Sequence, residues 1–242
     1  MIPLRDANPS RTTPVVTYIL ILLNALVFLY QLKLGKNLDG FFYVYAIIPE
    51  KYFSLGAADV GNFIGRFLPF FTSQFLHGGF FHVIGNMWFL WIFGDNIEDH
   101  LEHFKFILFY LLCGVAAGLT HVYTNPSSQI PTVGASGAIA GVMGAYILLY
   151  PRARVKTLIP IFYFIQIVEL PAFLFLGIWF VIQFFSGAIS LATAGATGGV
   201  AWWAHIGGFV VGIVLILILP KRKEVSQVQK IMGSSSRNFF DD

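Results

Sequence analysis

Charged side chains are scarce in this sequence. Asp, Glu, Lys and Arg make up 11% of its 242 residues, whereas a typical soluble domain carries about 25%. Hydrophobic residues make up 57%, aromatic residues 17%, and the mean hydropathy is +0.74. A chain with so little polar surface cannot cover a water-soluble core, so the composition predicts a polytopic protein embedded in a lipid bilayer. The net charge of +3 comes from cations that flank apolar segments, which favours a role in membrane topology and argues against nucleic acid as a partner.

Cysteine is nearly absent, because Cys113, inside an apolar run, is the single one. This excludes an internal disulfide. The HExxH motif of zinc peptidases is also missing, and no pair of aspartates falls in the middle of an apolar segment. A metal site that uses His77 and His121 is an alternative, but neither their spacing nor a partnering carboxylate supports it. We therefore expect neither a metal nor another cofactor.

Six apolar segments are long enough to cross a bilayer, for which about twenty residues suffice. They cover residues 15–32, 80–98, 104–123, 133–150, 171–190 and 202–219. No A-x-A cleavage site follows the first segment, so we interpret it as a retained helix and not as a signal peptide. The apolar run 158–168 is shorter, and we expect an interfacial or re-entrant segment there. These segments predict an all-α polytopic fold, a bundle of six transmembrane helices.

The distribution of Lys and Arg predicts the orientation of the bundle. With the N-terminus inside, eleven of the fifteen lie in inner segments and four in the first loop, roughly 33–79. We therefore expect cytoplasmic termini, a cytoplasmic segment 1–14, a six-helix domain 15–219 and a basic, disordered tail 220–242. The aromatic first loop is expected to associate with the outer leaflet. The lack of further domains and of targeting segments favours a prokaryotic plasma membrane.

Four polar residues of the predicted helices fall at one depth. His82 and Asn86 are spaced i,i+4 and so share one face of the second helix. Ser136 lies in the first turn of the fourth helix and His205 in the first turn of the sixth. Each residue alone is explained by a hydrogen bond between helices. Together, at the same end of three helices that run in one direction, they indicate a site that faces the bundle interior.

Glycines surround Ser136 in the stretch "TVGASGAIAGVMGAY" (132–146). Gly137 and Gly141 form a GxxxG pair, and small residues recur at every fourth position in Ala204, Gly208 and Gly212, a spacing typical of close helix packing. That packing would also bring Ser136 to His205. Gly134 differs, since it lies at the junction of loop and helix, where unusual dihedrals and free backbone N–H groups are needed.

These residue types suit nucleophilic catalysis. A serine becomes a nucleophile when a base accepts its proton, and histidine is the usual base. No Asp or Glu occurs between Glu102 and Glu169, so the sequence predicts a Ser–His dyad without an acidic third member. His82, the Asn86 amide and the Ser136 backbone N–H are the candidate donors for an oxyanion hole.

The motifs resemble those of the rhomboid intramembrane serine proteases. The similar stretches are "HGGFFHVIGN" (77–86), "GDNIED" (94–99), "GASG" (134–137) and "AHIGGFVVG" (204–212). The resemblance implies that Ser136 is the nucleophile and His205 the base, and that His82, Asn86 and the Ser136 N–H form the oxyanion hole. It implies supporting roles for the glycines Gly134, Gly137 and Gly208. The substrates would be transmembrane proteins, cut near the outer end of a membrane helix that unwinds locally.

The resemblance also implies that Glu98 is a structural anchor near the inner end of the second helix and that His77 is structural. Two positions depart from the family pattern. Leu68-Pro69 stands where many members have Trp-Arg, so the first loop must be anchored differently. Ala140 stands where many members have an aromatic ring against the base, and we expect Trp202 or Trp203 to pack there instead.

Two other functions compete with proteolysis. An inactive rhomboid-like scaffold would bind membrane helices without cutting them, but such relatives generally lose the serine or the histidine, and both are here. A transporter could use His82 and His205 as a proton relay, but membrane carboxylates and an inverted repeat with broken helices are missing. We also expect the glycine-rich loop 193–201 to act with the fifth helix as a gate, ordinary loop flexibility being the alternative. The sequence does not specify the oligomeric state.

Overall fold

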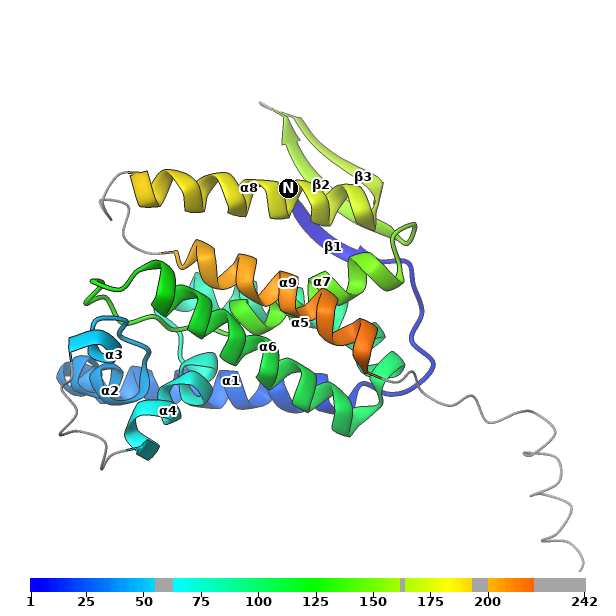
Figure 1. The fold of residues 1–242 in the computed structure, drawn as a ribbon. Coiled ribbons are helices and arrows are strands. Elements are labelled where there is room, and N and C mark those ends of the chain that lie inside the picture. The colour runs from blue at the N-terminus through cyan, green and yellow to red at the C-terminus, as the bar shows by residue number, and fades with distance from the viewer. Residues whose placement is uncertain (55–62, 162–163, 193–199, 220–242) are drawn as a thin grey trace, which may run out of the picture.

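The protein is a mostly helical bundle in which the long helices lie side by side. A computed structural model describes residues 1–54, 63–161, 164–192 and 200–219. The long helices are α1 (Val15–Leu34), α5 (Phe80–Leu101), α6 (His103–Thr124), α7 (Ser136–Leu149), α8 (Ala172–Ala192) and α9 (Trp202–Ile218) (Figure 1). Each coincides with one of the six apolar segments expected from the sequence. The tail 220–242 and most of the loop 193–201 lie outside the described residues.

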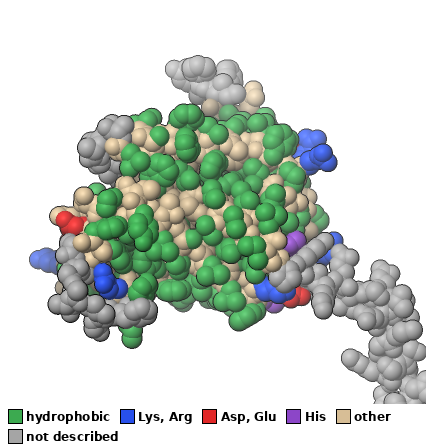
Figure 2. Space-filling model, viewed as in Figure 1, with side chains coloured by type: hydrophobic (Ala, Val, Ile, Leu, Met, Phe, Trp, Pro, Cys, Tyr) green, Lys and Arg blue, Asp and Glu red, His purple; other side chains and the backbone are tan. Residues whose placement is uncertain are grey.

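The outer surface of the bundle is apolar. Figure 2 shows hydrophobic side chains over the middle of one face, with charged side chains gathered toward the two ends of the helices. Among the described residues, three helical stretches are long and apolar enough to span a membrane: Val15–Tyr45, His103–Thr124 and Ala172–Leu191. α7 and α9 are apolar but shorter, and α5 ends in an acidic stretch. The protein is therefore a membrane protein.

Helix α7 lies at the centre of the bundle. Its residues from Gly137 to Tyr146 are all buried, and it packs against α9, α6 and α5. Small side chains explain this position. A Cβ on Gly208 of α9 would lie 2.0 Å from the carbonyl oxygen of Gly137, and one on Gly144 would lie 2.2 Å from that of Phe209. The backbones of α7 and α9 are thus in direct contact, as the small-residue spacing predicted.

The expectation of an all-α fold is wrong, because residues 154–161 and 164–171 form two paired strands in the region where an interfacial or re-entrant segment was expected. Strands β2 (Arg154–Ile161) and β3 (Phe164–Pro171) pair in antiparallel register, and β1 (Ile2–Asp6) pairs with β2, which gives the strand order β1-β2-β3. The hairpin is rich in Val, Ile and Thr, which favour strands. Its partner is at the far end of the sequence, so the apolar run alone did not reveal the sheet.

The N-terminal segment is therefore part of the fold. Trp88 of α5 donates its indole N–H to the carbonyl of Pro3 at 2.6 Å. The hydroxyl of Tyr146 donates to Asp6 at 2.6 Å. Burial raises the pKa of Asp6, although this hydrogen bond opposes the shift. The sheet is thus tied to both α5 and α7.

The first loop folds into η1 (Gly35–Asn37), α2 (Leu38–Tyr45), α3 (Lys51–Ser54), α4 (Phe63–Thr72) and η3 (Ser73–Phe75). It is anchored to the segment that precedes α7. Ile47 and Thr132 exchange two backbone hydrogen bonds, of 3.2 and 2.7 Å, and the Gly134 N–H donates to the Ser73 carbonyl at 2.9 Å. These backbone contacts hold the loop to the chain just before Ser136.

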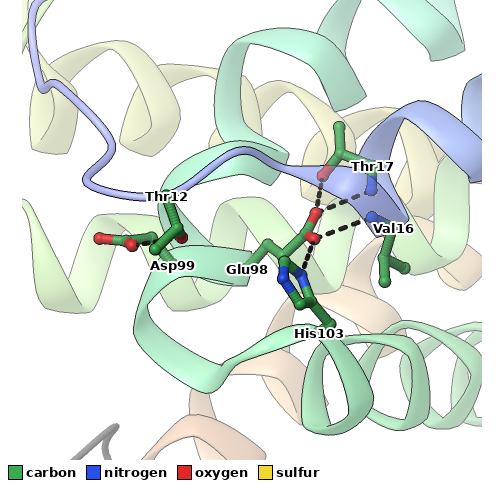
Figure 3. A network of polar contacts seen from close by, with 6 residues as sticks. All are labelled: Thr12, Val16, Thr17, Glu98, Asp99 and His103. Atoms are coloured by element: carbon green, nitrogen blue, oxygen red, sulfur yellow. Dashed lines mark hydrogen bonds and ion pairs between the residues drawn. The ribbon is translucent and has the colours of Figure 1, made fainter. Parts of the chain in front are cut away.

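Glu98 holds the other end of the bundle together (Figure 3). Its buried carboxylate accepts the backbone N–H groups of Val16 and Thr17 at 2.8 and 2.7 Å, and the Thr17 hydroxyl at 2.7 Å. His103 contacts the same carboxylate at 2.5 Å. The first N–H groups of a helix have no partner within the helix, so Glu98 of α5 caps α1. The expected structural anchor is confirmed.

Candidate active site

Ser136 and His205 form a hydrogen bond between α7 and α9. The distance from Ser136 Oγ to His205 Nε2 is 2.7 Å. Both residues lie in the first turn of their helices, within one turn of the contact between Gly137 and Gly208. The close approach of two small-residue helices therefore places a hydroxyl and an imidazole in the geometry that proton transfer requires.

The other ring nitrogen of His205 contacts a residue that the sequence analysis missed. His205 Nδ1 lies 2.7 Å from Oε1 of Gln183, a buried residue of α8 that is 6% exposed. The signal in the sequence was a lone amide in the middle of an apolar helix. The search for a third member considered only carboxylates and so passed over it.

Aromatic rings also fix the plane of the histidine. The ring of Trp179 lies 5.9 Å from that of His205 at an interplanar angle of 34°, and the ring of Trp202 lies 6.4 Å away at 85°. Trp203 instead donates its indole N–H to the Gly187 carbonyl at 3.2 Å. Of the two tryptophans expected against His205, Trp202 contacts its ring and Trp203 is bonded to Gly187 instead, while the contact of Trp179 with the ring was not expected.

His82 and Asn86 form the opposite wall, on α5. A Cβ on Gly134 would lie 2.7 Å from His82 Nε2 and 3.6 Å from Asn86 Nδ2, and Gly134 has a φ of +130°. A side chain here would strain the backbone and fill the space between the two polar groups. The Asn86 amide nitrogen is buried and has no hydrogen-bond partner among the described residues. It is a donor available to a ligand.

The tautomer of His82 follows from its other nitrogen. The Gly78 backbone N–H donates to His82 Nδ1 at 3.4 Å. In a neutral imidazole that accepts at Nδ1, the proton is on Nε2. Nε2 is the nitrogen beside Gly134, so His82 presents a second N–H donor to the same space as Asn86.

His77 supports the loop before α5. Its backbone N–H donates to Gln31 Oε1 at 3.0 Å, and its carbonyl accepts from Gln31 Nε2 at 2.8 Å. Its ring is 1% exposed and lies 5.2 Å from the ring of His82. Burial lowers the pKa of His77 to about 3, so the ring is neutral at physiological pH. The two hydrogen bonds to Gln31 are made by the backbone of His77, so the structural role expected for its side chain stays a prediction.

A cavity of about 1730 Å³ joins these groups. Apolar side chains of α5, α7 and α8 line one part of it, among them Phe89, Met143 and Trp179. Polar residues of the segment between α6 and α7, such as Asn125 and Gln129, line another part. No cluster of three or more possible metal ligands occurs among the residues that the structure describes. The arrangement suits acyl transfer to a serine within a largely apolar cavity.

Comparisons with known proteins connect this geometry to a family. The sequence model of the Rhomboid domain matches residues 65–222, more than half of the chain. Rhomboid-like protein 11, chloroplastic, of Arabidopsis thaliana is 32% identical over 69% of this chain and 57% of its own length. Rhomboid protein 1, mitochondrial, of Saccharomyces cerevisiae is 26% identical over 69% of this chain and 46% of its own length. The human presenilin-associated rhomboid-like protein, mitochondrial, is 31% identical over 60% of this chain and 36% of its own length.

The chain thus spans about half or less of the length of these relatives. Their names place them in chloroplasts and mitochondria. This contradicts the expectation of a prokaryotic plasma membrane. The expectation that both termini are cytoplasmic was part of it and is withdrawn too.

Proposed function

Because the chain belongs to the rhomboid family, we propose that it is an intramembrane serine endopeptidase that hydrolyses peptide bonds in or near transmembrane helices of other membrane proteins. The observation that carries the proposal is the 2.7 Å hydrogen bond between Ser136 Oγ and His205 Nε2 inside a shared cavity. A protein that only bound helices would not need a serine paired with a base in this way.

The first half-reaction acylates the enzyme. Ser136 Oγ attacks the carbonyl carbon of the scissile bond while its proton passes to His205 Nε2. The tetrahedral intermediate collapses, the C–N bond breaks, and the amine leaves with the proton from His205. Water then attacks the ester carbonyl, His205 accepts the proton of that water, and Ser136 Oγ recovers it as the acid product leaves.

Three donors stabilise the negative oxygen of each intermediate. They are the Asn86 Nδ2–H, the His82 Nε2–H and the backbone N–H of Ser136, which begins α7 without an intrahelical partner. The orphaned Asn86 amide supports this role. Loss of one such donor typically costs about 10²- to 10³-fold in rate. Gly134 keeps the space open, and Gly137 with Gly208 keeps the serine near the base.

The substrate is a transmembrane helix that unwinds near one end. Membrane helices satisfy their own backbone hydrogen bonds, so a peptide carbonyl reaches Ser136 only after local unwinding. The cavity has a volume of about 1730 Å³ and is lined by polar groups that can bind the released backbone. Substrates with small or helix-breaking residues at this end are therefore expected to be cut fastest.

For the membrane setting of the site, we propose that residues 15–219 form the catalytic domain and that the six long helices all span the bilayer. The short α7 is buried at the centre of the bundle, and α9 exposes one apolar face. The apolar side chains of α4, such as Ile64 at 76% exposure, support contact of the first loop with lipid. The membrane that holds the protein is, by analogy with its chloroplastic and mitochondrial relatives, an inner membrane of an organelle.

The test uses purified protein in detergent with a fluorophosphonate probe and a transmembrane-helix reporter. Wild type is expected to be labelled and to cut the reporter. Ser136→Ala should lose both activities, and His205→Ala should lose them almost completely. Ser127→Ala is the matched control, because Ser127 lines the same cavity without a histidine bonded to it among the described residues, and it should behave as wild type.

Equal labelling of wild type and Ser136→Ala would refute the nucleophile. A wild-type protein that binds the reporter without labelling or cleavage would favour the scaffold.

A further inference from the structure

The contact between Gln183 and His205 has no part in the chemical steps above. We propose that Gln183 is a positioning residue that fixes the tautomer of His205 and makes base function depend on the position of α8. This inference rests on the proposed function for its effect on rate, but its structural content can be measured without activity.

Burial of the amide requires an explanation. Gln183 is 6% exposed in a helix whose neighbouring Ile182 and Phe184 are 50% and 45% exposed on the apolar surface. A polar group within a membrane helix is costly unless it has a partner. The partner of Gln183 Oε1 is His205 Nδ1, 2.7 Å away, so a hydrogen bond to the proposed base offsets the cost of burial.

The direction of this bond decides whether His205 can act. With Oε1 of Gln183 as acceptor, His205 carries its proton on Nδ1. Nε2 is then unprotonated and accepts the proton of Ser136 across 2.7 Å. With the opposite tautomer, Nε2 would carry the proton and the serine hydroxyl would have no base. Gln183 thus does by hydrogen bonding alone what a carboxylate does in a Ser-His-Asp triad.

No other described group supplies this orientation through charge. The titratable groups that influence His205 are His82 of α5 and His121 of α6, both histidines. Trp179 and Trp202 pack against the ring and restrict its plane, but they carry no acceptor for Nδ1–H. The choice of tautomer therefore falls to Gln183.

Gln183 lies about three turns beyond the anchored N-terminal turn of α8. Its first turn is fixed, since the N–H groups of Ala172 and Phe173 donate to the carbonyls of Ala153 and Pro151 at 2.8 and 3.0 Å. Phe175 and Leu176 are fully buried. Gln183 is eleven residues beyond Ala172, or about 16 Å along the axis, so a tilt of about 10° displaces it by roughly 3 Å. A tilt of this size would break the bond between Gln183 and His205 and the bond between Trp203 and the Gly187 carbonyl, which holds α8 to α9 beyond Gln183. His205 is therefore oriented as a base only while α8 is packed on α9.

Two substitutions of Gln183 and one control substitution test the proposal through fluorophosphonate kinetics. Gln183→Leu removes the acceptor for His205 Nδ1–H, so both tautomers of His205 become available. In a soluble triad, forcing the wrong tautomer lowers the rate about 10⁴-fold. Because the correct tautomer stays accessible here, we expect kinact to fall by about 10- to 100-fold. KI should change much less than kinact, because Leu and Glu are close in size to the Gln183 side chain that lines the cavity. Gln183→Glu restores an acceptor and most of the rate. Gln166→Leu, at an exposed glutamine of β3, is the matched control and should behave as wild type.

The pH profile separates positioning from a structural role. A carboxylate at position 183 stabilises the imidazolium, so the acid limb of the labelling rate should move to higher pH in Gln183→Glu. A variant that only loosens the bundle lowers the thermal midpoint but leaves the limb in place. If Gln183→Leu does not fold, the acid limb of the labelling rate in Gln183→Glu decides whether Gln183 positions His205.

Nitrogen-15 NMR of the histidine rings tests the tautomer in the same detergent, with His205 identified by its loss in His205→Ala. Wild type should show protonated Nδ1, and Gln183→Leu a shift toward protonated Nε2. Wild type with protonated Nε2, or a variant with unchanged tautomer and unchanged kinact, overturns the proposal. If wild type is not labelled at all, the protease function fails and the NMR result alone decides the role of Gln183.

Discussion

Substitution of Gly208 by alanine is the sharpest test of how the fold makes the site. The new Cβ would lie 2.0 Å from the Gly137 carbonyl oxygen. Ordinary contact begins at 3.4 Å, so α7 and α9 must separate by about 1.4 Å (3.4 − 2.0) at this point. The obstacle is backbone, which cannot rotate away as a side chain can. Overpacking typically costs about 1–3 kcal/mol, and we expect a value at or above the top of that range.

The same separation acts on the catalytic pair. Ser136 precedes Gly137, and His205 lies one turn before Gly208. If the helices part by about 1.4 Å, the 2.7 Å bond lengthens to about 4.1 Å, which is too long for a hydrogen bond. Gly208→Ala should therefore lose fluorophosphonate labelling as well as stability. The assay pairs the labelling rate with unfolding in mixed micelles of increasing SDS fraction.

Two further glycines serve as controls. Gly212→Ala meets the Gly141 carbonyl at 2.1 Å, about 10 Å along α9 from His205, so it should cost similar stability but less labelling. Gly177→Ala of α8 has nothing within 4 Å of its new Cβ and should be neutral, or stabilising by up to about 1 kcal/mol through helix propensity. The reasoning is refuted if Gly208→Ala unfolds and labels like Gly177→Ala.

Two other predictions concern anchors of the site. Glu98→Ala leaves two buried N–H groups of α1 without an acceptor and should lower the unfolding free energy by about 3 kcal/mol or more. The control Glu102→Gln, at an exposed residue, should cost under about 1 kcal/mol. Equal losses of unfolding free energy in SDS titrations of the two variants would show that Glu98 does not cap α1. Gly134→Ala combines a φ of +130° with a Cβ 2.7 Å from His82 Nε2, so labelling should fall about 100-fold or more. Gly40→Ala, which meets nothing within 4 Å, should label normally, and normal labelling of Gly134→Ala would remove Gly134 from the site.

The helices and the contact between Ser136 and His205 were predictable because their signals are local. A run of about twenty apolar residues specifies a membrane helix, and small residues at every fourth position specify close contact between helices. Position along parallel helices then placed Ser136, His205, His82 and Asn86 at one level. None of these steps needed knowledge of distant pairings.

The sheet and Gln183 were not predictable for the opposite reason. β1 and β2 are about 150 residues apart in sequence, and strand pairing over such a distance leaves little local trace. A single amide in α8 is equally consistent with any neighbour. Only the packing of α8 on α9 shows that it meets His205.

An amide in place of a carboxylate is consistent with the surroundings of this site. An acidic third member would have to be buried in an apolar bundle, where desolvation of an unpaired carboxylate costs several kcal/mol. While His205 is neutral, such a carboxylate would have no counter-charge. Gln183 orients the ring without that cost, but it stabilises the imidazolium less when the proton arrives from Ser136. We therefore expect Gln183 to give a slower reaction of Ser136 but a more stable folded protein than a carboxylate would. Gln183→Glu should unfold at a lower SDS fraction and should be labelled at an undiminished or higher rate above neutral pH. A Glu variant that is both more stable and slower than wild type would contradict this explanation.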